Sequence, residues 1–177
     1  MFQVQHTLFE DTHCEPPTVA GYHKACLGHS LLVNDAFATD IKSDTRLCRR
    51  GDKIDVYRNL NIKDMMSCKQ RHGQWKGKVT GYAKAFVLVD FEFVVSEASR
   101  QRVLREQRKN VHGFCRGVLE DAFNSDFDIN ALPSNHRVVT YNPYRAGHFF
   151  DRLTNEPVTR PQETYALVYG GNVYLMD

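Results

Sequence analysis

The sequence lacks the short motifs that identify the commonest enzyme classes. It contains no Walker A loop, no dinucleotide-binding GxGxxG, no HExxH zinc motif and no GxSxG nucleophile elbow. Asp126 and Asp128 lie in a turn-rich stretch without an obvious third carboxylate, so two-metal nuclease chemistry is not supported either. No motif names a reaction, and function has to be inferred from weaker patterns.

Long apolar runs are also missing. No stretch approaches the ~20 apolar residues that a membrane span requires. The first residues do not combine a basic segment with an apolar run, as a secretory signal does. The cysteine count, 5, is odd, which favours free thiols in a reducing compartment. We therefore expect a cytoplasmic protein with no membrane partner, located in the host cytoplasm if the chain is viral.

The chain carries little net charge. Its formal charge is only +2, although 25% of the residues are charged and 42% are hydrophobic, as in ordinary globular proteins. This balance argues against a histone-like, polybasic binder but is compatible with one basic face. The length of 177 residues predicts a single domain, residues 51–177, with an N-terminal appendage, residues 1–50.

Alternation of apolar and polar residues predicts mostly β-structure in the domain. Residues 53–60 alternate, with Arg58 on the same face as Ile54 and Val56, and residues 77–95 carry the strongest strand signal in the chain. The expected fold is α+β: a mostly antiparallel sheet or partial barrel with one main basic helix and the N-terminal appendage.

Two local details of this pattern are open to a direct check. Residues 77–95 form either two strands joined near Asp90 or one long strand that a bulge bends there. In the appendage, residues 31–38 are a candidate short helix.

The most informative pattern is a basic stretch. Residues 96–116 place six Arg and Lys side chains around one interior acid, Glu106. Residues 97–109 are predicted to form a helix with Ser96 as N-cap and Asn110 as its stop. Three of the cations then follow one another at i, i+3 and i+7 on one face: Arg102, Arg105 and Lys109.

Like charges so close together cost free energy unless an anion faces them. Nucleic acid is the expected partner, and an acidic host protein is the alternative. A third interpretation is a solvated helix face whose arginines pair with the acids of residues 120–128. The residues expected to bind nucleic acid are Arg58, Asn59, Arg100, Arg102, Arg105, Arg108, Lys109 and Arg116.

The end of the basic stretch, residues 108–112, also contains the residue types that a metal-independent ribonuclease uses: a histidine beside Lys, Arg and Asn. His112 would act as general base or acid, and Lys109 or Arg116 would stabilise the charged phosphorane. His136 or His148 could supply the second histidine that such enzymes use. In the alternative interpretation, His112 only packs at the helix end and donates a hydrogen bond to a carbonyl. The predicted catalytic residues are His112, Lys109, Asn110 and Tyr141.

The appendage contains a cluster of residues that zinc prefers as ligands. His23, Cys26 and His29 follow one another at intervals of three residues, after His13-Cys14. On a helix only two of the three would ligate comfortably, whereas on a loop all could turn inward. The sequence has no CxxC knuckle, and the alternative is a set of unrelated polar and buried side chains. Apart from this candidate metal site, no cofactor is predicted.

Several blocks together resemble an uncharacterised family of phage and bacterial proteins. They are VYRNL at residues 56–60, Gly77-Lys78-Val79, RVLREQRKNVHGF at residues 102–114, and TYNPY at residues 140–144 with Phe149-Phe150. The similarity covers residues 53 to about 175 and leaves the appendage outside it. The resemblance implies a shared fold and a microbial or viral origin, and it carries no catalytic role.

The leading hypothesis is therefore a phage-type accessory protein of the host cytoplasm. It binds an anionic macromolecule, with nucleic acid favoured, and acts on a host factor or defence system. The first alternative is a metal-independent ribonuclease or nucleotide-processing enzyme centred on His112. The second is an inhibitor that docks on an acidic host protein without contacting nucleic acid.

Overall fold

The structure is a computed structural model that describes residues 21–26, 28–37, 46–145 and 149–177. Its elements, in chain order, are α2 (Tyr22–Ala25), β1 (Ala36–Phe37), β2 (Cys48–Arg49), β3 (Lys53–Arg58), β4 (Met66–Gln70), β5 (Val79–Ala83), β6 (Ala85–Val95), α3 (Glu97–Glu106), β7 (Gly113–Phe123), η1 (Ile129–Ala131), β8 (Arg137–Tyr141), β9 (Phe149–Asp151), β10 (Tyr165–Tyr169) and β11 (Asn172–Met176).

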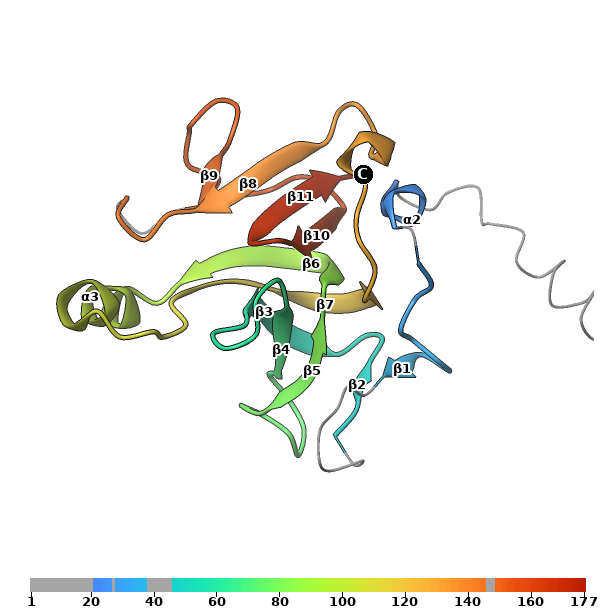
Figure 1. Ribbon diagram of the computed structural model, residues 1–177, viewed down its shortest axis with the longest axis horizontal. Helices are drawn as coiled ribbons and strands as arrows, with labels where there is room; N and C mark the ends of the chain where they lie inside the picture. Colours follow the sequence, from blue (N-terminus) through green and yellow to red (C-terminus); the bar gives the residue numbers. More distant parts are fainter. Residues whose placement is uncertain (1–20, 27, 38–45, 146–148) are drawn as a thin grey trace, which may run out of the picture.

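Nine of these strands form one antiparallel sheet in the order β5-β4-β3-β7-β6-β10-β11-β8-β9 (Figure 1). Strand accounts for 45% and helix for only 12% of the structure, so the expected α+β class is wrong and the fold is mostly sheet. The sheet curls but is not a closed barrel, because β5 and β9 each pair with one neighbour only. No helix in the described ranges has the length and apolar character needed to cross a membrane.

The two longest strands, β6 and β7, pair along the middle of the sheet and bend it. Their register shifts between Val87 and Leu88 and again between Val89 and Glu92. Asp90, inside the second shift, has a left-handed φ of 47°. The bulge, one of the two alternatives expected near Asp90, is present, and such a bulge bends its strand and increases the local twist. The break between the two strands of residues 77–95 lies at Lys84, where neither alternative placed it.

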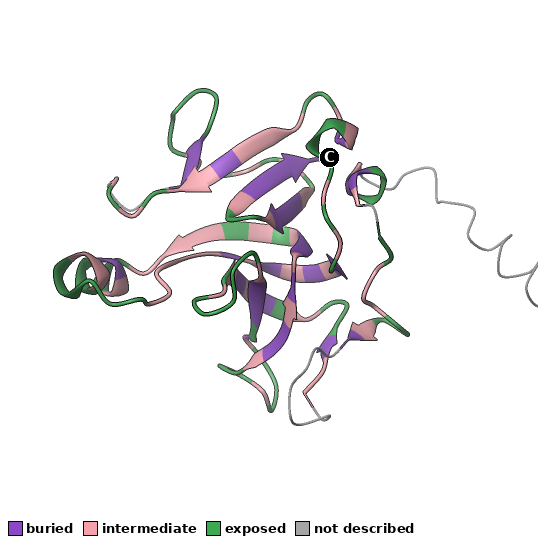
Figure 2. Cartoon of the chain, viewed as in Figure 1, coloured by how far each residue is buried: buried purple, intermediate pink, exposed green. Residues whose placement is uncertain are grey.

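β10, β11 and the first four residues of β6 are buried on both faces, because a separate hydrophobic cluster lies on each side of the sheet (Figure 2). Alternation divides β10 between them: Ala166 and Val168 point to the inner cluster, inside the curl, and Leu167 points to the outer one. α2 and the segment around η1 cover the outer cluster, to which they contribute Tyr22 and Leu132.

The described residues of the predicted appendage pack on the sheet. Tyr22 and Ala25 belong to the outer cluster, and Phe37 and Cys48 to the inner one. The short helix expected at residues 31–38 is wrong over its described part, because Val33 bridges Ala36 in a tight turn that leads into β1.

The basic helix is shorter than expected. α3 begins after Ser96, as predicted, but it ends at Glu106, where Gln107 takes a left-handed φ of 54° and donates its N–H to the Val103 carbonyl. Arg108 and Lys109 therefore lie in the segment between α3 and β7. The helix projects from the margin of the sheet, and Arg100 is its one buried residue (Figure 1).

Candidate functional site

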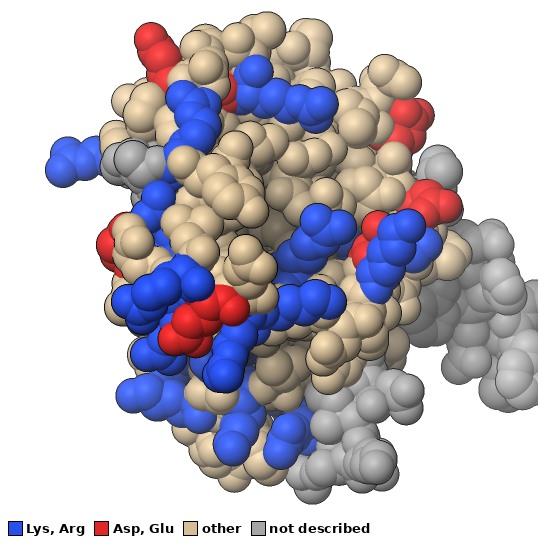
Figure 3. Space-filling view, turned by 60° about the vertical axis from the view of Figure 1, so that its left-hand side comes forward, with Lys and Arg blue, Asp and Glu red and all other residues tan. Residues whose placement is uncertain are grey.

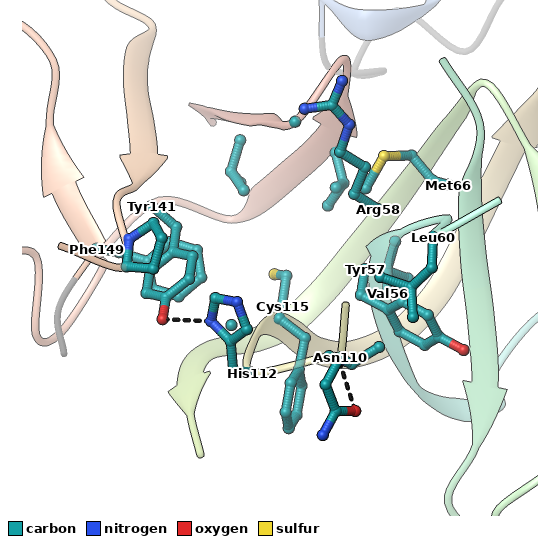
Figure 4. A pocket seen from close by; sticks show the side chains of 17 residues that line it. Val56, Tyr57, Arg58, Leu60, Met66, Asn110, His112, Cys115, Tyr141 and Phe149 are labelled. Carbon is teal, nitrogen blue, oxygen red and sulfur yellow. Dashed lines mark hydrogen bonds between the residues drawn. The ribbon is translucent and has the colours of Figure 1, made fainter. Parts of the chain in front are cut away.

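A cavity of about 320 Å³ opens at one end of the inner cluster, where β3 and β7 face the strands at the other end of the curled sheet (Figure 4). Most of its wall is apolar or aromatic, and its polar side chains include Arg58, Asn110, His112 and Tyr141. The apolar part includes Val56, Leu60, Met66, Phe114, Cys115, Phe149, Val168 and Val173. β3 and β8 are far apart in strand order, so only the curl brings Arg58 and Tyr141 to the same cavity.

His112 and Tyr141 are hydrogen-bonded to each other on one wall. His112 Nδ1 lies 2.7 Å from the Tyr141 hydroxyl oxygen, and the His112 carbonyl accepts a bond of 2.7 Å from the backbone N–H of Ser96. The Tyr141 ring also stacks on Phe149, with centroids 5.0 Å apart. The pair is thus fixed by the start of β7, the N-terminus of α3 and β9.

Gly113 allows this close approach. A β-carbon at residue 113 would lie 2.5 Å from two ring atoms of Tyr141, so the aromatic ring rests directly on the glycine backbone. Gly113 was not among the predicted site residues, although its place immediately after His112 was a signal in the sequence.

The surroundings of the pair disfavour the charged form of both side chains. Burial and the Arg100 guanidinium lower the pKa of His112. Burial raises the pKa of the Tyr141 hydroxyl, with Glu97 adding to the rise and Arg100 opposing it. His112 Nε2 makes no hydrogen bond with any described residue, so a neutral ring offers one donor or one acceptor there, according to its tautomer.

Arg58 stands on the opposite wall from His112 and Tyr141 (Figure 4). The alternation of β3 places it on the face of Ile54 and Val56, as predicted, but at the open end of the core, where it is exposed. It makes no hydrogen bond or ion pair with the described part of the chain. Its Nη1 reaches the β10–β11 turn, within 3.8 Å of where a β-carbon of Gly171 would lie.

Asn59, which was grouped with Arg58 in the sequence analysis, does not line the cavity. Its side-chain nitrogen donates to Ser67 Oγ at 2.9 Å, and its Oδ1 accepts from the backbone N–H groups of Asn61 and Ile62. Asn59 thus organises the β3–β4 turn.

The predicted catalytic residues meet only in part. Asn110, His112 and Tyr141 line the cavity, and Lys109 does not, although it precedes Asn110 directly. His136 cannot serve as the second histidine, because it lies against Tyr174 in the outer cluster region and its Nδ1 is 2.7 Å from the Pro133 carbonyl. His148 lies outside the described residues.

Four exposed cations follow one another on α3 and in the segment after it, and we call them the basic segment: Arg102, Arg105, Arg108 and Lys109. Arg105 and Arg108 both approach one carboxylate, that of Glu106, at 3.8 Å. Arg102 and Lys109 form no ion pair with the residues that the structure describes. Lys and Arg side chains gather on this face around a hollow (Figure 3).

Two cations predicted to bind nucleic acid are instead engaged within the protein. Arg100 is only 7% exposed, donates through Nε to the Pro143 carbonyl at 2.8 Å and pairs with Glu97 at 2.6 Å. Arg116 pairs with Asp55 at 2.9 Å. Neither residue is therefore counted among the cations available to a partner, because their N–H donors face oxygen atoms of the protein itself.

The basic segment does not pair with the acids of residues 120–128 in the described structure. Glu120 instead binds Arg50 at 3.0 Å, and Asp126 binds Lys84 at 3.1 Å. The interpretation of α3 as a face neutralised by that acidic stretch therefore finds no contact to support it.

The predicted zinc ligands do not come together. Among the described residues, no group of three or more His, Cys, Asp or Glu side chains is placed to hold a metal ion. The His23 ring lies tilted against Tyr22, and His29 is exposed. Burial together with Asp121 raises the pKa of the Cys26 thiol to about 12, which disfavours the thiolate form that zinc binds. His13 and Cys14 lie outside the described residues.

Comparison with known proteins identifies the family. No solved structure is significantly similar to this chain. The gene 82 protein of Mycobacterium phage L5 is 29% identical over 118 residues, which cover 64% of this chain and 88% of that protein. The family described as Mycobacterium phage L5 gene 82 protein matches residues 48–173, most of the sheet and the whole cavity wall. The phage family expected from the sequence is thereby confirmed, and the chain belongs to the family of the Mycobacterium phage L5 gene 82 protein.

Proposed function

We propose that this phage-family protein binds nucleic acid through the basic segment and Arg58. The observation that carries the proposal is a concentration of unneutralised cations beside a cavity in a chain whose formal charge is only +2. Arg58, Arg102 and Lys109 have no acidic partner in the described structure, whereas Arg50, Arg100 and Arg116 are paired internally.

The charges on this face favour an extended anion. Glu106 is shared by two arginines at 3.8 Å, so one carboxylate cannot neutralise the basic segment. Phosphates spaced along a strand can face several cations at once, and each contact releases counterions, which supplies most of the free energy of such binding.

A salt titration tests the proposal. Binding to a single-stranded oligonucleotide is expected to weaken as salt rises, with roughly three units of log–log slope if four or five phosphates are contacted. Reversing two charges, Arg102→Glu with Lys109→Glu, is expected to lower the slope by about one unit or more.

The matched control is Lys24→Glu. Lys24 is exposed on α2, on the opposite side of the molecule from α3, and its reversal changes the net charge in the same direction (Figure 1). It is expected to leave the slope unchanged. Absence of nucleic-acid binding by the wild type at low salt would refute the proposal, and retention of an acidic host protein after nuclease treatment would then favour protein docking.

A second candidate function is ribonuclease or nucleotide-processing activity. The meeting of His112, Tyr141 and Asn110 at one cavity favours it, since a neutral imidazole can accept a proton there. His112→Ala is expected to abolish turnover of RNA or nucleotide without unfolding the protein. Turnover that persists in this variant would exclude His112 as the catalytic base.

A further inference from the structure

We infer that the cavity between β3, β7 and β8 receives one unstacked base of a single-stranded nucleic acid, with Arg58 beside its sugar-phosphate backbone. This inference rests on the proposed nucleic-acid binding and specifies its substrate class. A base inside a duplex is stacked and paired, whereas a base of a single strand can turn into a protein pocket.

The size and lining of the cavity suit a base. At about 320 Å³ it falls at the small end of ligand sites, and its wall is mostly apolar or aromatic with a few polar groups. Tyr57 and Phe114 also line the cavity and contribute aromatic rings of the kind on which bases stack. Leu60 and Arg58 are exposed, so the cavity is open to solvent at their end.

The polar groups of the cavity match the edge of a base. His112 and Tyr141 satisfy each other through one hydrogen bond of 2.7 Å, which leaves His112 Nε2 without a described partner. With the proton on Nε2 the pair presents a donor, and with the proton on Nδ1 it presents an acceptor together with the free Tyr141 hydroxyl proton. Base edges carry donors and acceptors side by side, so they can pair with either arrangement.

The charges around the cavity place a phosphate nearby. Arg58 stands across the cavity from His112 with no acidic partner in the described structure (Figure 4). Lys109 directly precedes Asn110, which lines the cavity on the other side. A strand held by the basic segment is therefore carried past the opening, where one of its bases can enter while its phosphates remain outside with the cations.

The test compares two strands with the same number of phosphates, an oligonucleotide and its fully abasic analogue. The wild type is expected to bind the base-bearing strand roughly tenfold more tightly, because stacking of one base on an aromatic side chain is worth about that factor. Val173→Phe fills the cavity from β11, where Val173 is buried, and leaves every cation in place. This variant is expected to bind both strands with equal affinity and an unchanged salt slope.

Val173→Ala is the matched control, since it changes the same buried residue but leaves the cavity open, and it is expected to keep the preference for bases. A wild type that binds both strands equally would overturn the inference and leave the proposed function standing. The same holds if a folded Val173→Phe variant retains the full preference. The wild-type comparison needs no variant, so it decides the matter even if Val173→Phe fails to fold.

A mononucleotide separates the two failures. If neither strand binds at low salt, the proposed function is refuted, and adenosine monophosphate is then titrated while the ring resonances of His112 and Tyr141 are followed by NMR. Saturable changes in the chemical shifts of both rings would support the cavity as a binding site for a free nucleotide. Unchanged resonances would overturn the inference together with the proposed function.

Discussion

His112 lines the cavity, is hydrogen-bonded to Tyr141 and has a shifted pKa. Burial and the Arg100 guanidinium disfavour its protonation, so the folded-state pKa lies below the ordinary value of about 6.5. Between those two values the unfolded chain binds the proton and the folded protein does not. The contribution of neutral His112 to the free energy of unfolding is therefore fully present above about pH 6.5. It is lost as the pH falls through that value toward the folded-state pKa.

This pH dependence can be isolated in His112→Gln, which cannot titrate. Urea unfolding of both proteins at roughly pH 7.5 and roughly pH 5.5 is expected to show that the wild type loses more stability on acidification than the variant does. The comparison cancels the other histidines, which both proteins share. An equal loss in the two proteins would mean that the folded protein does not hold His112 neutral.

Arg100 positions the chain around the site. Its buried guanidinium joins α3 to the Pro143 carbonyl, two residues beyond Tyr141. Arg100→Ala is expected to cost about 2 kcal/mol of unfolding free energy, the range found for hydrogen bonds to charged groups. Arg102→Ala, on the same helix but exposed and unpaired among described residues, is expected to change stability by less than about 0.5 kcal/mol. Denaturant unfolding measures both, and equal effects would show that Arg100 has no structural role.

At the scale of elements, the start of β7 decides whether the cavity forms. Gly113→Ala is expected to destabilise the protein by about 1–3 kcal/mol, because the new methyl group would overlap the Tyr141 ring at 2.5 Å. In a Tyr141→Ala background the same change creates no overlap with the ring and is expected to cost about 1 kcal/mol less. Unfolding free energies of the four proteins give this coupling, and perfect additivity would contradict the contact.

The individual strands were largely predictable because their signals are local. Residues 53–58 and most of residues 79–95 form strands, as their alternation predicted, and the bulge that was one of two alternatives near Asp90 is present. The end of α3 was not, because Gln107 takes a left-handed conformation for which glycine or asparagine is the usual signal. The expected α+β class gave too much weight to helix. The one strong helical pattern in the sequence forms only the ten residues of α3, which lie at the margin of the sheet.

At the scale of the whole molecule, the site depends on contacts that no local pattern encodes. Arg58, His112 and Tyr141 were each singled out from the sequence, but their convergence follows from the curl of a nine-stranded sheet, which brings β3 opposite β8. Burial of Arg100 and the apolar wall at Met66 and Phe149 also arise only from this arrangement. The sequence therefore identified these polar side chains, but it could not predict the cavity that brings them together.

The described residues before β2 complete the core of this sheet, although the family match begins at residue 48. The Phe37 ring fills the space over Gly81, where a β-carbon would lie 2.7 Å from it, and Tyr22 is buried against the outer face. Removing residues 21–46 would expose the surfaces that both aromatic side chains cover. Complete burial of two large side chains is worth about 3–6 kcal/mol, so a chain shortened to residues 47–177 is expected to lose at least that much stability.

The matched comparison is a chain of residues 21–177, which keeps every described residue. The difference in unfolding free energy between the two shortened chains, measured in urea, isolates residues 21–46. Tyr22→Ala and Phe37→Ala in the full chain are each expected to reproduce a part of it, since both remove a buried ring. If the two shortened chains are equally stable, the segment is an independent appendage. A large difference would make the segment and the sheet one cooperative unit, because a curled sheet with two buried faces needs a cover on its outer side as well as a core inside the curl.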